Sequence, residues 1–195
     1  MIYLTADLHL GHTGVFGLSP RPFSCIEETA EALLASLNAA VGPKDTLYVL
    51  GDFTMRTKAE DVLAYASSIR CRNKVLVRGN HDQARALADA FSEVLDYKEI
   101  RFDRRLVCMS HYPMMDWNRC TKDYPPPPGK KGSVMAHGHI HSVGPSLNLA
   151  NLVRGVWRWD VGVDANGYAP VALEEIVARI EGGDHGVSDN EEEEA

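Results

Sequence analysis

The sequence lacks the marks of several protein classes. None of its 195 residues belongs to an apolar run of about 18 or more, so we expect no membrane span. The N-terminus, Met1-Ile2-Tyr3-Leu4, has no basic region or cleavage site and predicts a first strand rather than a signal peptide. No internal repeat is present. With 45% hydrophobic residues, the chain suits one globular domain with a sizeable core.

Paired cysteines are also missing. The four cysteines are widely spaced and form no CxxC pair; they are Cys25, Cys71, Cys108 and Cys120. This spacing argues against a disulfide framework and against a cysteine zinc site. It favours a reducing compartment, and we therefore expect a cytoplasmic protein.

Basic charge is scarce, and the acidic excess is confined to one end. The last fifteen residues hold seven acids and no Lys or Arg, which accounts for the whole net charge of -7. The rest of the chain is therefore near neutral and lacks the basic footprint of a nucleic-acid-binding protein. We expect a folded domain over residues 1–180 and a disordered, solubilising acidic tail over 181–195.

Polar side chains are concentrated where short apolar segments end. Val75 to Val77 predicts a buried strand that runs into Gly79-Asn80-His81-Asp82. Ile2 to Ala6 predicts another, followed by Asp7-Leu8-His9-Leu10-Gly11-His12, in which Asp7 and His9 share a face. Three further segments end in the same way, at Gly51-Asp52, Ser110-His111 and His137-Gly138-His139-Ile140-His141. Open α/β sheets bind ligands at the carboxyl ends of their strands.

The distribution of histidine supports a metal site. Each cluster alone also fits an ordinary polar turn, but seven of the eight histidines fall in these segments and only His185 lies outside them. Histidine is the commonest metal ligand. Carboxylate combined with imidazole favours Mn, Fe, Zn or Ni over Ca.

The remaining elements are predicted from periodicity and capping. Ser24, with Glu27 three residues later, predicts a capped helix, and Lys58 to Ile69 predicts a second helix. A short helix over 84–91, strands over 94–97 and 156–163, and a helical or strand–helix end over 171–180 are also expected.

The segment from Met114 to Gly132 fits neither a helix nor an inner strand, because it contains Pro125 to Pro128. A long loop of this kind is usually functional or disordered. We interpret it as a wall beside the substrate, carrying Trp117, Asn118, Arg119, Lys130 and Lys131.

The five clusters together resemble, in order, the motifs of the calcineurin-like metallophosphoesterases. The matching residues are Asp7-x-His9, Gly51-Asp52, Gly79-Asn80-His81-Asp82, His111 and Gly138-His139-x-His141. Two further stretches, Arg21-Pro22-Phe23 and Asp160-Val161-Gly162-Val163-Asp164, are similar to a small bacterial and phage branch of that superfamily.

The resemblance implies a four-layer α/β/β/α sandwich with two divalent metal ions at the strand ends. The metals would be Mn, Fe, Ni or Zn, with Mn the most readily used in vitro. It implies that Asp52 bridges both ions. The other ligands would be Asp7, His9 and His141 for the first ion and Asn80, His111 and His139 for the second.

The resemblance also suggests roles around the metals. His81 would act as general acid or as a charge stabiliser, with Asp82 fixing its tautomer. His137 would support ligands without binding metal. Substrate contacts are expected from His12, Arg78 and Trp117, with Arg21 a weaker candidate and Lys130 and Lys131 as further cations near the phosphate.

The implied activity is hydrolysis of a small phosphodiester or nucleotide-like substrate, by direct attack of a hydroxide held between the metals. Three alternatives remain open at this point: a phosphomonoesterase, a non-catalytic metal-binding interaction scaffold, and a structural or storage metal site. No membrane or long nucleic-acid partner is expected.

Overall fold

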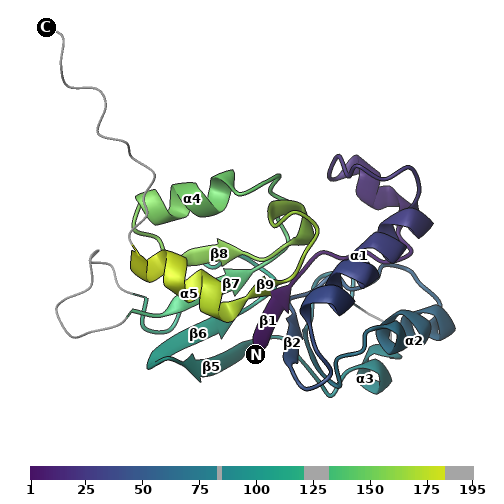
Figure 1. The fold of residues 1–195 in the computed structure, drawn as a ribbon, viewed down its shortest axis with the longest axis horizontal. Helices are drawn as coiled ribbons and strands as arrows, with labels where there is room; N and C mark the ends of the chain where they lie inside the picture. Colours follow the sequence, from purple (N-terminus) through teal and green to yellow (C-terminus); the bar gives the residue numbers. More distant parts are fainter. Residues whose placement is uncertain (83–84, 121–131, 183–195) are drawn as a thin grey trace, which may run out of the picture.

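The computed structural model describes residues 1–82, 85–120 and 132–182. Two β-sheets pack against each other, and helices cover the outer side of the first sheet and one side of the sandwich (Figure 1). The α/β sandwich that the sequence predicted is confirmed. Within the described residues, no helix is long and apolar enough to cross a membrane.

The first sheet has the strand order β4-β3-β2-β1-β9. Its strands are β1 (Ile2–Thr5), β2 (Thr46–Val49), β3 (Asn73–Val77), β4 (Glu93–Leu95) and β9 (Val171–Ala172). Strands β1 to β4 pair in parallel, and only the short β9 is antiparallel. The carboxyl ends of β1, β2 and β3 therefore meet at one edge.

The second sheet has the order β5-β6-β7-β8. Its strands are β5 (Lys98–Phe102), β6 (Arg105–Met109), β7 (Val134–His137) and β8 (Arg158–Asp160). β6, β7 and β8 are parallel, whereas β5 forms an antiparallel hairpin with β6. Isolated bridges from Ala6 to Gly162 and from Leu10 to Thr54 extend the pairing beyond the strand ends.

Alternating residues of each strand enter different cores, as the two-residue period of a strand requires. Val75 and Val77 face the second sheet and join its Val107 and Met109 in one core, whereas Leu76 faces the helices. Because both faces are covered, these strands are continuous apolar runs rather than alternating ones.

Helices cover the outer face of the first sheet and one side of the sandwich. α1 (Ile26–Ala40), α2 (Ala59–Ser68) and α3 (Leu87–Ala90) pack on the first sheet (Figure 1). α4 (Ser146–Val153) lies against β8, and α5 (Leu173–Gly182) contacts β1 and β9. The apolar side of α5 enters the core between the sheets.

The structure corrects several local predictions. The capping interaction at α1 joins Ser24 to Glu28 rather than to Glu27, and the N-cap is Cys25, whose Sγ accepts the Glu28 N–H. Strand β5 and helix α4 were not predicted. The strand expected over 156–163 is β8, followed by a 3-10 turn at Val163–Ala165.

The boundary of the folded domain also moves. Glu181, assigned to the tail by its charge, lies in α5 and accepts hydrogen bonds from the buried Arg105 guanidinium. Gly182 ends α5, and residues 183–195, with His185, lie outside the described residues. So do Pro125 to Pro128, Lys130 and Lys131 of the long loop.

Trp117 belongs to the outer face of the second sheet. Its side chain is only 8% exposed and forms a small core with Cys108 of β6 and Met135 of β7. Those two residues point away from the core between the sheets, since their neighbours in each strand face inward. Trp117 therefore covers part of the outer face of the second sheet, the face on which the α/β/β/α arrangement would have a helix layer.

We predict that Trp117→Ala lowers the free energy of unfolding by about 3–5 kcal/mol, the usual cost of removing a large buried aromatic side chain. Urea denaturation measures this. Met115→Ala is the matched control, because Met115 lies in the same segment and is 95% exposed. That control should change the free energy by less than about 0.5 kcal/mol. Equal effects of the two substitutions would contradict the burial of Trp117.

Candidate metal centre

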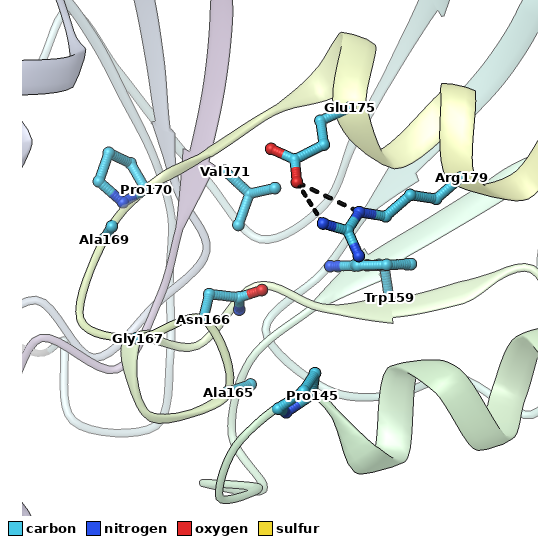
Figure 2. Close-up of a pocket in the computed structure, with 10 residues that line it drawn as sticks. All are labelled: Pro145, Trp159, Ala165, Asn166, Gly167, Ala169, Pro170, Val171, Glu175 and Arg179. Carbon is cyan, nitrogen blue, oxygen red and sulfur yellow. Dashed lines mark hydrogen bonds and ion pairs between the residues drawn. The ribbon is translucent and has the colours of Figure 1, made fainter. Parts of the chain in front are cut away.

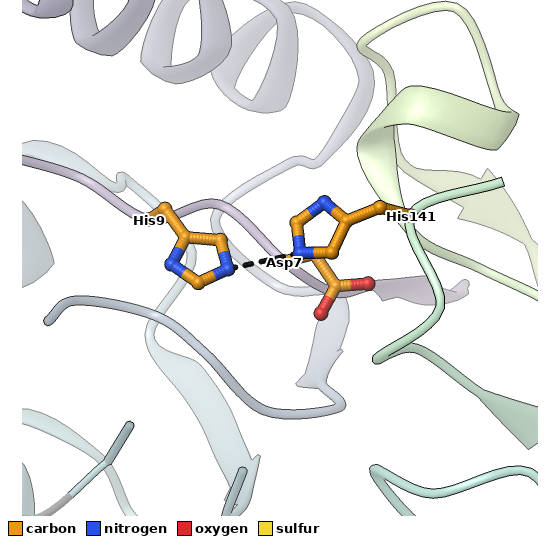
Figure 3. Close-up of side chains that lie close together, drawn as sticks. All are labelled: Asp7, His9 and His141. Atoms are coloured by element: carbon orange, nitrogen blue, oxygen red, sulfur yellow. Dashed lines mark hydrogen bonds between the residues drawn. The ribbon is translucent and has the colours of Figure 1, made fainter. Parts of the chain in front are cut away.

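The carboxyl end of β1 contributes two of the three side chains of a first ligand group. The Nε2 atoms of His9 and His141 lie 3.2 Å apart (Figure 3), and the Asp7 carboxylate is part of the same cluster. The ligand atoms of these three side chains all lie within 4.8 Å of one another. Three chemically suitable donors thus converge on one point from two distant parts of the chain.

A second group forms at the ends of β3, β6 and β7. His111 Nε2 lies 2.9 Å from Asn80 Oδ1, and His139 Nδ1 lies 3.1 Å from the same oxygen. The two imidazole nitrogens are 3.2 Å apart. One amide oxygen and two ring nitrogens therefore face a common centre.

Asp52, after β2, lies between the two groups. Its Oδ2 is 3.5 Å from His9 Nε2 and 3.6 Å from His111 Nε2. A single carboxylate oxygen thus faces both sets of donors. This is the position that a bridging ligand between two cations needs.

A hydrogen bond on the far side of the His111 ring determines which ring nitrogen faces the centre. His111 Nδ1 donates a hydrogen bond to the Leu50 carbonyl at 2.9 Å, so Nε2 carries the free lone pair. His141 is held similarly, with Nδ1 donating to Asp164 Oδ2 at 2.8 Å. Such partners fix the tautomer and the ring orientation of a metal-binding histidine.

Asp164 is itself anchored by Arg21. The buried guanidinium binds both carboxylate oxygens of Asp164, at 2.9 and 3.2 Å, and donates to the backbone carbonyls of Asp7 and Leu8. Arg21 therefore joins the loop after β1 to the support of His141. The sequence analysis named Arg21 only as a weak candidate for substrate binding and gave Asp164 no role. The sequence feature that could have indicated Asp164 is the Asp160–Asp164 stretch, which lies at the end of a strand.

Asp82 accepts hydrogen bonds from the backbone of two loops. Its carboxylate accepts hydrogen bonds from the backbone N–H groups of Asp52 (2.7 Å), Phe53 (3.0 Å) and Gly79 (2.9 Å). Among the described residues, none of its hydrogen bonds joins it to His81. These hydrogen bonds tie the loop after β3 to the loop after β2, and the role of Asp82 toward His81 stays a prediction.

The backbone at the centre is held in unusual conformations. Five of the predicted ligands have positive φ angles: Asp7, His9, Asp52, His139 and His141. Residues other than glycine seldom adopt this region, and such strain is concentrated at functional sites. Gly51 has a φ of +89°, and a Cβ there would lie 2.3 Å from His111 Nδ1. The loop after β2 can therefore approach His111 this closely only because Gly51 has no side chain.

The electrostatics of the centre favour a cation. Burial raises the pKa of Asp7 to about 8, and burial together with neighbouring positive groups lowers the pKa of His9 to about 2. Burial also lowers the pKa of His111. The pKa of His141 is raised against the effect of burial by its hydrogen bond to Asp164. The buried carboxylates therefore face little positive charge besides His141, and a divalent metal ion would supply more. The donor set therefore fits the metals that the sequence implied.

His81 and His12 lie beside the first ligand group. His81 Nε2 is 3.8 Å from Asp52 Oδ2, and its ring centroid is 5.5 Å from that of His9. The His12 ring lies 5.4 Å from His9 and 6.3 Å from His81. Burial, His81 and then Arg56 lower the pKa of His12. Arg56 is an exposed cation near this side of the centre that sequence reasoning missed.

The other expected substrate contacts lie elsewhere. Arg78 forms a two-point ion pair with Asp96 at 2.9 and 2.8 Å, so its guanidinium already has an anionic partner. Trp117 is buried on the outer face of the second sheet, so stacking on a substrate does not agree with its position. His137 is buried and its Nδ1 donates a hydrogen bond to the Gly138 carbonyl, while its support of the ligands stays a prediction.

A cavity of about 360 Å³ lies apart from these groups, between α5 and the segment from Ala165 to Val171 (Figure 2). Trp159 and Arg179 form one wall, and the Arg179 guanidinium pairs with Glu175. None of the predicted ligand or substrate residues lines this cavity. We therefore place the candidate site at the strand ends and not here.

Comparison with known proteins relates the chain to a family of phosphoesterases. A family model described as calcineurin-like phosphoesterase matches residues 1–173. The uncharacterized protein MJ1445 of Methanocaldococcus jannaschii is 27% identical over 194 residues, covering 93% of this chain and 92% of that protein. The Gene 66 protein of Mycobacterium phage L5 is 26% identical over 194 residues, covering 85% and 87%.

One solved structure has the same overall fold. The protein of unknown function AQ665 from Aquifex aeolicus superposes with a TM-score of 0.69 at 26% identity, covering 91% of this chain and 97% of that one. The phage relative agrees with the small bacterial and phage branch suggested by the sequence.

The raised pKa of Asp7 predicts how the metal-free protein responds to pH. The ordinary pKa of Asp is 3.8, so between pH 3.8 and about 8 the folded state holds a proton that the unfolded state has lost. Folding therefore weakens as pH rises through this window. His9 acts oppositely, but only below its ordinary pKa of 6.5.

Between pH 6.5 and 8 we expect the metal-free protein to lose up to about 2 kcal/mol of stability through Asp7. Urea denaturation in a chelating buffer at several pH values measures this. Asp7→Asn should reduce the slope, because the amide does not titrate, and the remainder belongs to His141, whose pKa its hydrogen bond to Asp164 raises against the effect of burial. Saturating Mn²⁺ should remove the slope. A slope that Asp7→Asn leaves unaltered would assign the effect to another group.

Proposed function

This chain belongs to the calcineurin-like phosphoesterase family, and from that premise we propose that it hydrolyses a phosphoester with two divalent cations held at the strand ends. One observation carries the proposal: a single oxygen of Asp52 lies within 3.6 Å of imidazole nitrogens from both ligand groups. Two neighbouring cations need a shared anionic ligand, since it offsets their repulsion.

We assign the ligands of each metal ion according to the two groups of side chains described above. Asp7, His9 and His141 would hold one ion with Asp52, and Asn80, His111 and His139 would hold the other, also with Asp52. When bound, such a pair of ions lowers the pKa of water and neutralises charge on phosphoryl oxygens. The choice of Mn, Fe, Ni or Zn agrees with a set of imidazole, carboxylate and amide donors.

His81 is the proposed proton donor. It follows the ligand Asn80, its ring is partly exposed, and its Nε2 lies 3.8 Å from the bridging carboxylate of Asp52. An imidazolium here would protonate the departing oxygen of the ester. The His81 backbone N–H donates to Asp52 Oδ1 at 3.0 Å, which fixes the backbone from which the ring projects.

We propose a small phosphodiester as the substrate class. A diester carries one negative charge at phosphorus where a monoester carries nearly two, and two of the expected cations are already paired. Arg21 is held by Asp164 and Arg78 by Asp96. The exposed Arg56, near His12, remains a candidate for one charge. A phosphomonoesterase is the alternative, and a panel of mono- and diesters with Mn²⁺ distinguishes the two.

A non-catalytic scaffold would keep the fold without needing a proton donor or a complete ligand set. Convergence of all seven ligand side chains favours catalysis over that alternative. A structural or storage site would likewise have no need of His81 beside the centre.

We expect chelation to abolish hydrolysis of bis(4-nitrophenyl) phosphate and Mn²⁺ to restore it. Asp52→Asn should cost the most activity among the ligand substitutions and should lower the bound metal below two ions per chain, because the bridge serves both. Metal analysis and nitrophenolate release are the measurements. Asp61→Asn, an exposed acid on α2, is the control. Full activity of stripped protein would refute the two-metal proposal.

His81→Ala should retain both metals yet lower kcat by roughly 10²–10⁴-fold, the range for a lost general acid. The loss should be smaller for a 4-nitrophenyl ester than for an alkyl ester, since nitrophenolate leaves without protonation. Metal analysis accompanies the kinetics. If His81→Ala loses metal instead, His81 is a ligand, and its role as acid is wrong.

A further inference from the structure

An aromatic side chain lies directly against the second ligand group. Tyr112 follows His111 at the end of β6, and its ring centroid lies 5.0 Å from the His111 ring and 4.8 Å from the His139 ring. Both contacts are edge-to-face, with interplanar angles of 71° and 67°. Despite this packing, Tyr112 is 48% exposed.

A backbone hydrogen bond and two imidazole contacts hold Tyr112 in place. The Tyr112 backbone N–H donates to Ser110 Oγ at 3.2 Å, and Ser110 itself is buried. Two imidazoles restrict one side of the ring, and solvent meets the other. A ring fixed before binding loses little conformational freedom when a ligand stacks on it.

A second apolar side chain is exposed in the same set of loops. Ile140 lies between the ligands His139 and His141 and is 41% exposed. Large apolar side chains that remain exposed beside a site commonly mark a contact surface. The opposite side of the centre differs, because His81 and His12 lie near the first ligand group there.

We propose that Tyr112 contacts the substrate and selects phosphoesters that carry a planar aromatic substituent, such as an aryl group or a nucleobase. This inference rests on the proposed phosphoesterase function and names a feature of its substrate. Base–aromatic stacking contributes about 1–3 kcal/mol by alanine substitution, which corresponds to roughly a 5- to 150-fold effect. Tyr112 takes the role that the sequence assigned to the buried Trp117.

Binding without turnover provides the first test. Phenylphosphonate and methylphosphonate carry the same anionic group on a carbon–phosphorus bond that the proposed reaction does not cleave. Calorimetry on the Mn²⁺-loaded wild-type protein should show tighter binding of phenylphosphonate. Tyr112→Ala should reduce the phenyl-to-methyl ratio of affinities about tenfold, and Tyr112→Phe should retain it, since the ring remains.

Kinetics provide the second test. Bis(4-nitrophenyl) phosphate and methyl 4-nitrophenyl phosphate share a leaving group and differ only in the other substituent. Tyr112→Ala should lower the aryl-to-methyl ratio of kcat/KM about tenfold, mainly through KM. Met115→Ala, an exposed apolar change three residues further on, is the matched control and should keep the wild-type ratio.

Metal analysis of each variant distinguishes a contact between Tyr112 and the substrate from a role of Tyr112 in positioning the metal ligands. If Tyr112→Ala loses metal, or lowers kcat/KM equally for both diesters, Tyr112 orients His111 and His139 and the proposal is overturned. Unaltered ratios in both tests would also overturn it. If no ester is hydrolysed but the phosphonate preference depends on Tyr112, the proposed hydrolysis fails while the aromatic contact stands.

Discussion

The structure depends on holding two buried carboxylates and several neutral imidazoles close together at one edge of the sandwich. Asp7 and Asp52 are almost inaccessible to solvent, and burial of an ionised carboxylate without a positive partner costs several kcal/mol. The low pKa of His9 leaves the lone pair of its ring nitrogen free to bind a cation. The proposed pair of divalent cations would supply that positive charge, and the ligand side chains reach this place from five strand ends.

Backbone strain and outer hydrogen bonds keep the ligands in place. Positive φ angles at Asp7, Asp52 and His139 turn their side chains inward, and the Asp82 carboxylate ties two of the loops together through three backbone amides. Arg21 performs a similar task around Asp164. The stability needed to maintain such strain comes from the cores on either side of the first sheet.

The two sides of the centre are chemically different. The imidazoles of His81 and His12 lie beside the first ligand group, whereas Tyr112 exposes an aromatic ring beside the second. A phosphoester bound between them would place polar and aromatic substituents on different sides. This asymmetry bears on substrate choice more directly than the net charge of the chain, which resides in its tail.

The sequence by itself determined the buried strands and the polar residues at the end of each. Continuous apolar runs predicted buried parallel strands, and since parallel strands share an edge, the residues after them were expected to meet. Local periodicity, however, contains no information about partners across the sheets. Arg21 binds Asp164 across 143 positions, Asp82 bonds to the loop after β2 rather than to its neighbour, and Trp117 turns to the outer face of the second sheet. These contacts were decided only by the tertiary structure, because they depend on which faces the packed sheets leave open.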